Sequence, residues 1–189
     1  NFFEDFTLGQ VIHHATPRTI TEGDVSLYSA LYGTRFAVQS AESFAKAIGY
    51  PRAPVDDLLV FHVVFGKTVP DISLNAVAGF NQDGVEVLDY VRWVMVRKKN
   101  EHDTPPEPAV PKLPSAIAPD QLGKGLPPIN VREYNFRLAG SEHRFADYTP
   151  GERIDHVDGM TVEDAEQQIA TRLYQNTAKV HFNHFAQKS

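Results

Sequence analysis

Cysteine is absent from this chain of 189 residues. A disulfide framework, a thiolate nucleophile and a thiolate metal site are therefore excluded. Positive charge is also scarce, because 18 lysines and arginines stand against 24 aspartates and glutamates and leave a formal net charge of −6. We expect no nucleic-acid partner, since binding along DNA or RNA depends on an excess of basic residues.

Long apolar runs are missing as well. No stretch approaches the roughly 20 apolar residues that a membrane-spanning helix needs. Residues 1–5 also lack the basic and apolar regions of a signal peptide. The sequence therefore predicts a cytoplasmic protein without a membrane partner. Its 42% of hydrophobic and 22% of charged residues are typical of a soluble globular chain.

Several catalytic motifs are lacking too. The chain has no Gly-x-Ser-x-Gly elbow, no phosphate-binding glycine-rich loop and no Gly-x-Gly-x-x-Gly, which leaves hydrolase, nucleotidase and dinucleotide-binding functions without support. His181 and His184 could place two imidazoles on one face of a helix. No further ligand stands at a matching spacing, so we predict no metal site.

The predicted helices and strands follow an order that occurs twice. Apolar periodicity and capping residues indicate helices over residues 22–32, 40–48, 55–69 and 163–174. β-Branched and aromatic residues indicate strands over residues 11–20, 85–98, 131–138 and 152–162. Eight of the 13 prolines lie in residues 101–128, which we interpret as an extended linker.

An ungapped shift of 142 residues makes the repetition explicit, because it aligns residues 3–39 (the first repeat) with residues 145–181 (the second repeat). Ten of the 37 aligned pairs are identical: Phe3/Phe145, Asp5/Asp147, Thr7/Thr149, Gly9/Gly151, Ile12/Ile154, His14/His156, Thr19/Thr161, Leu31/Leu173, Tyr32/Tyr174 and Val38/Val180. A repeated strand and helix predict two copies of one domain, packed as a pseudo-dimer.

Several motifs carry a resemblance to a known family. They are Phe3-x-Asp5-Phe6-x-x-Gly9-Gln10, Thr19 to Asp24, Leu27 to Gly33 with Ala41, Ala45, Gly49 and Tyr50-Pro51, Asp56 to Lys67, and Thr171 to His181. Together they resemble the MaoC-like dehydratases, and among these the two-copy mesaconyl-CoA hydratases. The resemblance implies an α+β tandem hot-dog fold, in which an antiparallel sheet wraps around a central helix.

The family's catalytic signature is an Asp followed five residues later by a His. In this sequence its two positions hold Thr34 and Gln39 in the first repeat, and Asn176 and His181 in the second. The first pair has no ionisable group and cannot shuttle a proton. The resemblance therefore implies a degenerate first site and a working second site, where His181 handles the proton and Asn176 holds water or a substrate oxygen.

The central helix of the family receives the thioester oxygen at its N-terminus, which here matches Asp56 and Asp57. Carboxylates at that place would repel an oxyanion, which again favours a structural role for the first copy. The chain also passes almost directly from this helix to its last strand. We therefore expect that middle strands near Ala78, and the part of the second copy beyond Ser189, are missing from the sequence.

These features predict a first unit over residues 1–100, the linker over 101–128 and an incomplete, site-bearing unit over 129–189. The resemblance implies reversible hydration of mesaconyl-CoA to β-methylmalyl-CoA, with coenzyme A as part of the substrate, no separate cofactor, and a homo-oligomer. Arg172 is the candidate for binding the free carboxylate of the substrate. Two alternatives remain: an (R)-specific enoyl-CoA hydratase of broader specificity, and a non-catalytic hot-dog protein that binds acyl thioesters.

Overall fold

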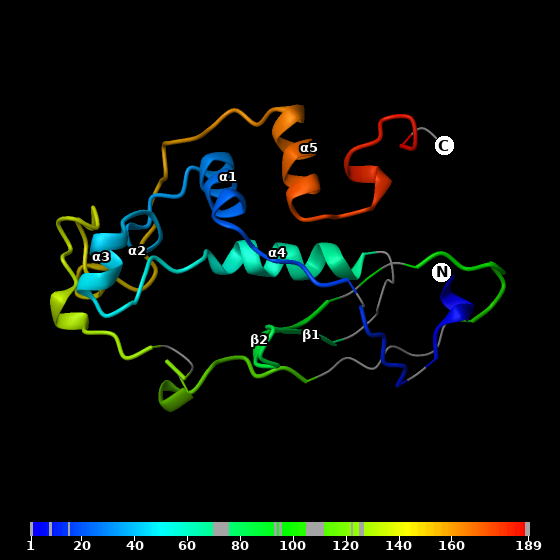
Figure 1. Cartoon of the computed structure of the whole chain (residues 1–189), viewed down its shortest axis with the longest axis horizontal. Helices are drawn as coiled ribbons and strands as arrows, with labels where there is room; N and C mark the ends of the chain where they lie inside the picture. Colours follow the sequence, from blue (N-terminus) through cyan, green and yellow to red (C-terminus); the bar gives the residue numbers. More distant parts are fainter. Residues whose placement is uncertain are drawn as a thin grey trace.

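The computed structural model describes the chain apart from residues 1, 8, 15, 70–75, 93, 95, 105–111, 122, 125–126 and 188–189 and the side chain of residue 76. Its longest helix, α4 (Asp57–Thr68), lies between two helices on one side and a hairpin on the other (Figure 1). The two helices are α1 (Glu22–Tyr32) and α5 (Asp164–Leu173), and the hairpin is β1 (Ala76–Phe80) with β2 (Glu86–Val91). Two short helices, α2 (Ala37–Ser40) and α3 (Glu42–Ala47), follow α1.

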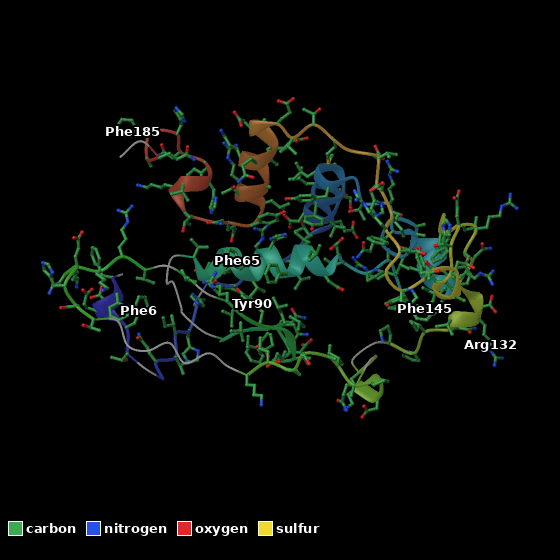
Figure 2. The ribbon with its side chains drawn as sticks, turned by 180° about the vertical axis from the view of Figure 1, so that it is seen from behind. Phe6, Phe65, Tyr90, Arg132, Phe145 and Phe185 are labelled. Carbon is green, nitrogen blue, oxygen red and sulfur yellow. The ribbon has the colours of Figure 1, made fainter. Side chains whose placement is uncertain are left out.

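Helix α4 is apolar nearly all round, which is why it is covered on both sides. On one side, Leu59 and Val63 pack with Tyr28 of α1 and Leu173 of α5 in the buried core. On the other side, the rings of Phe61 and Tyr90 lie 5.0 Å apart, edge to face. Figure 2 shows Phe65 on α4 above Tyr90 of the hairpin, and their ring centroids are 6.5 Å apart.

Local sequence signals account for the starts and ends of these elements. Thr21 and Asp24 form a capping box at the start of α1, with the Thr21 hydroxyl accepting from the Asp24 amide at 3.2 Å. The carboxylate of Asp56 accepts from the Leu58 amide at 2.8 Å and caps α4. The antiparallel hairpin turns at Asn81, whose side chain accepts from the amides of Asp83 and Val85.

The two repeats adopt the same local structure at matching positions. The 3-10 turns Phe3–Asp5 and Phe145–Asp147 each close with an aspartate that accepts from a backbone amide, at 2.8 Å in the first and 2.7 Å in the second. Gly9 and Gly151 both have positive φ, 78° and 84°. At the starts of α1 and α5, the carboxylates of Asp24 and Glu166 accept from the backbone amides of Thr21 and Glu163, which are equivalent residues of the two repeats. The sequence repeat is therefore also a structural repeat.

Five predicted elements need correction. The strands predicted over 131–138 and 152–162, and over the described residues of 11–20, are absent, and residues 131–133 form a 3-10 turn instead. Among the described residues of 85–98, the predicted strand is regular only from Glu86 to Val91. A strand needs a neighbour for its backbone groups, and in the described part of the chain only β1 and β2 pair with each other. The helix predicted over 40–48 is divided between α2 and α3, with Ala41 extended between them.

The predicted fold class is thus observed in part. An antiparallel pair of strands packs on the central helix, but within the described residues it does not wrap around that helix. The described residues between 101 and 128 contain the 3-10 turn Pro119–Gln121 and no α-helix or strand. None of the described helices has the length and hydropathy needed to cross a bilayer.

Candidate functional site

The two signature pairs stand on equivalent backbone turns, beginning where α1 and α5 end. Gly33 at the end of α1 has a φ of 58°, and Gln175 at the end of α5 has a φ of 53°. The next residue in each case is the first signature residue. The Thr34 amide donates to the Ser29 carbonyl at 3.3 Å, and the Asn176 amide donates to the Thr171 carbonyl at 3.1 Å. This is the hydrogen bond that closes a helix with a left-handed residue.

The second signature residues also lie on matching turns. Gln39 belongs to α2, and its amide donates to the Phe36 carbonyl at 3.0 Å. His181 ends the 3-10 turn Lys179–His181, and its amide donates to the Ala178 carbonyl at 3.1 Å. The backbone scaffold is therefore shared by both repeats, and what distinguishes them is the chemistry of the side chains.

The side chains of the second pair can donate a hydrogen bond and exchange a proton. Asn176 is half-buried, and its side-chain oxygen accepts from the Ala178 amide at 2.9 Å. This bond fixes the turn and leaves the amide nitrogen of Asn176 as a donor for an external oxygen. The imidazole of His181 is exposed to solvent and can exchange a proton with a bound molecule.

The first pair lacks this chemistry. Thr34 is half-buried, and the side-chain oxygen of Gln39 is buried without a hydrogen-bond partner in the described part of the chain. Neither residue can take up a proton at neutral pH. The structure thus places an imidazole on only one of two equivalent scaffolds.

Helix α4 holds the second signature from one side. A Cβ on Gly66 would lie 2.0 Å from the carbonyl oxygen of Tyr174 and 3.3 Å from the amide nitrogen of Asn176. Only glycine allows so close an approach of two backbones. A glycine within an apolar helix is a sequence signal for a close contact, but the sequence alone does not show which segment makes that contact.

Aromatic side chains join the repeats beside the same segment. The hydroxyls of Tyr32 and Tyr174, which are equivalent residues, are hydrogen-bonded at 2.5 Å. The ring of His62 stacks on Tyr174 with centroids 4.5 Å apart. Burial lowers the pKa of His62, and burial together with the Tyr32 hydroxyl raises the pKa of Tyr174. Both side chains are therefore held neutral in this junction.

Arg18 connects the two repeats by a second route. Its guanidinium donates to the Leu173 carbonyl at 2.5 Å and to the Asp24 carboxylate at 2.7 Å. Sequence reasoning missed this residue, because an arginine in a predicted strand carries no signal of a contact 155 residues away.

The remaining predicted features lie apart from these contacts. Arg172 is exposed and donates to the Gln168 side chain of the same helix at 3.0 Å. The carboxylate of Asp56 caps the start of α4, so the backbone amide of Leu58 already has a hydrogen-bond acceptor. The histidines, aspartates and glutamates of the described residues form no cluster of three or more that could hold a metal ion.

Comparison with known proteins identifies close relatives. The chain is 48% identical over 227 residues to the β-methylmalyl-CoA dehydratase of Chloroflexus aurantiacus. It is 46% identical over 228 residues to the mesaconyl-CoA hydratase of Cereibacter sphaeroides. These alignments take in 97% and 96% of this chain. No model of a protein family matches the sequence.

The chain is shorter than these relatives and spans 64% and 66% of their lengths. An alignment of 227 residues is also longer than the chain itself, which has 189. The relatives therefore hold residues within the aligned region that this chain lacks.

A crystal structure from Chloroflexus aurantiacus, titled as that of a putative MaoC domain protein dehydratase, superposes on the whole chain with a TM-score of 0.87 at 46% identity. The match takes in 66% of that crystallised chain. The sequence identity and the fold match therefore both indicate the family that the motifs of the two repeats resemble. This chain belongs to the MaoC-like dehydratase family.

Proposed function

We propose that this protein is an acyl-CoA hydro-lyase that interconverts mesaconyl-CoA and β-methylmalyl-CoA. The proposal rests on the identity of 48% and 46% to two enzymes named for this pair of compounds. The observation that carries it within the structure is the imidazole of His181 on the backbone turn that follows α5. Hydration of an unsaturated thioester needs a group of this kind to move a proton.

We further propose a tandem hot-dog organisation, with units at residues 1–100 and 129–189 joined by residues 101–128. The bond between the equivalent hydroxyls of Tyr32 and Tyr174 supports it, because equivalent residues of two related units meet on a two-fold axis. The packing of α1 against α5 supports the same pseudo-dimer. Association into a homo-oligomer stays a prediction.

The reaction adds water across the double bond of the thioester. In this proposal His181 removes a proton from water as the oxygen bonds to Cβ, and the electron pair moves toward the thioester carbonyl to form an enolate. The enolate then takes a proton at Cα, which His181 returns. The amide nitrogen of Asn176 donates to the oxygen of the water and holds it against Cβ.

Asn176 differs from the acidic residue of the family signature, and this assigns it a narrower role. An amide cannot accept a proton at neutral pH, so His181 alone carries the acid-base chemistry here. Arg172 remains the candidate for the free carboxylate of mesaconyl-CoA. Within the described residues its guanidinium donates only to the neutral side chain of Gln168, so a substrate carboxylate would not need to displace an acidic side chain.

The test is turnover of mesaconyl-CoA and, separately, of crotonyl-CoA by the protein, followed by loss of the enoyl-thioester absorbance. Preference for mesaconyl-CoA would support the proposal. Preference for crotonyl-CoA would instead identify a hydratase of broader specificity. Coenzyme A ester binding without turnover of either substrate would overturn the enzyme and leave an acyl-thioester-binding protein.

A further inference from the structure

Arg18 is the one side chain whose guanidinium bridges the first repeat and the end of α5 in the described residues. We propose that Arg18 is a positioning residue for the second signature, acting through α5 rather than on the substrate. This inference rests on the proposed function, because it means that a residue of the degenerate first unit positions the reacting residues of the second. The site is then a composite of both units.

The contact is placed where it can control the signature. The Leu173 carbonyl that accepts from Arg18 is in the last turn of α5, three residues before Asn176. Carbonyls at a helix C-terminus carry partial negative charge and attract a cation. Arg18 is also anchored at its other end by the carboxylate of Asp24, and the two side chains are only 11% and 17% exposed.

Asp24 makes this anchor rigid. Its carboxylate also accepts from the backbone amide of Thr21 at 2.8 Å, so it is fixed within the capping box of α1. A planar guanidinium with donors in a fixed fork transmits that rigidity to the Leu173 carbonyl. The start of α1 and the end of α5 are thereby held at one distance.

Gly66 holds the same segment from the opposite direction. Its backbone lies against Tyr174 and Asn176, so that the turn after α5 is enclosed between helix α4 and the Arg18 bond. Catalysis depends on this kind of fixation, because a displacement of about 1 Å in a reacting group costs up to ~10²-fold in rate.

The hydrogen bond from Arg18 to the second repeat has no counterpart from the second repeat to the first. The shift of 142 residues places Met160 opposite Arg18 and Leu31 opposite Leu173. Methionine has no donor, so it cannot make the reciprocal bond to the Leu31 carbonyl. The signature that receives the arginine keeps its imidazole, whereas the signature without it has Thr34 and Gln39.

The decisive variant is Arg18→Met, which installs the residue found at the equivalent place in the second repeat. Arg153→Met is the matched control, since Arg153 pairs with Asp155 on the surface and both side chains are largely exposed. Arg18→Lys is the conservative variant, because lysine keeps the charge but has a single nitrogen in place of the planar fork of donors. Each variant is compared with the parent protein at a temperature where all are folded.

Two readouts separate positioning from simple stability. With mesaconyl-CoA, Arg18→Met is expected to lower kcat by about ten-fold or more with little change in KM, because chemistry and not binding is perturbed. In NMR spectra, the backbone and side-chain amides of Asn176 are expected to shift and to exchange faster with solvent. Arg18→Lys should recover part of both effects, and Arg153→Met should show neither.

Each outcome decides the inference. Unchanged Asn176 amides in a folded Arg18→Met protein would overturn it, whether or not any substrate turns over. Shifted amides with an unchanged kcat would also overturn it, since Arg18 would then be only structural. If the parent protein itself does not turn over mesaconyl-CoA, the proposed function fails, while the amide spectra still test whether Arg18 positions the signature.

Discussion

Replacing Gly66 with alanine should loosen the contact between α4 and the second signature. The added Cβ would lie 2.0 Å from the carbonyl oxygen of Tyr174 and 2.9 Å from its carbonyl carbon. Since nonbonded carbon and oxygen atoms approach to roughly 3.3 Å, the segment must move by about 1 Å. The obstacle is backbone, which cannot rotate away as a flexible side chain could.

The expected cost follows from two opposing contributions. Alanine is favoured over glycine by about 1 kcal/mol inside a helix. Overpacking of a buried contact costs about 1 to 3 kcal/mol, and sometimes more. Because the clash here involves a fixed backbone on both sides, we expect the Gly66→Ala protein to lose about 1 to 2 kcal/mol of unfolding free energy.

Guanidinium denaturation measured by circular dichroism is the assay, and Gly23→Ala is its matched control. Gly23 lies in α1, and a Cβ there would meet only the Thr21 hydroxyl oxygen at an ordinary 3.6 Å. That substitution should be neutral or stabilising by a few tenths of a kcal/mol. Equal stability of Gly66→Ala and Gly23→Ala would show that the contact between α4 and Tyr174 does not require a glycine at position 66.

Two further predictions concern the junction beside Gly66. Tyr32→Phe and Tyr174→Phe should each lower the unfolding free energy by about 0.5 to 1.5 kcal/mol in the same assay. The double variant should lose less than the sum of the two single losses, because both substitutions remove the same hydrogen bond. Strictly additive losses would contradict this. Burial lowers the pKa of His62 below the ordinary 6.5, so its stabilising contribution is complete above that pH and is lost as the pH falls through the folded-state pKa. His62→Phe should therefore weaken the fall in unfolding free energy between pH 7.5 and pH 5, and equal falls in both proteins would argue against it.

The sequence predicted the helices more accurately than the strands. Helices α1, α4 and α5 follow from local signals that lie within each segment, such as the Thr21 capping box and the apolar run of residues 55–69. Strands depend on partners elsewhere in the chain. Residues 152–162 have the composition of a strand but pair with no neighbour among the described residues, and most of their apolar side chains are exposed.

The sequence predicted the positions of the candidate site residues from the repeat, but not the contacts that hold them. The shift of 142 residues identified Thr34 and Gln39 as counterparts of Asn176 and His181, and the structure places both pairs on matching turns. Which unit supports the second turn was not predictable, because the contacts of Arg18 and Gly66 join residues more than 100 positions apart. Long-range contacts of this kind leave no periodic signal in a single sequence.

If the second signature is the working site, turnover depends on its imidazole, and this is measured by comparing the turnover of mesaconyl-CoA by His181→Ala and His156→Ala. His156 is an exposed histidine of the same repeat outside the signature, so its loss controls for removal of an imidazole. We predict that His181→Ala loses about 10²- to 10⁴-fold in kcat, while His156→Ala retains the parent rate. Full activity of the His181→Ala protein would show that the second signature is not the working site.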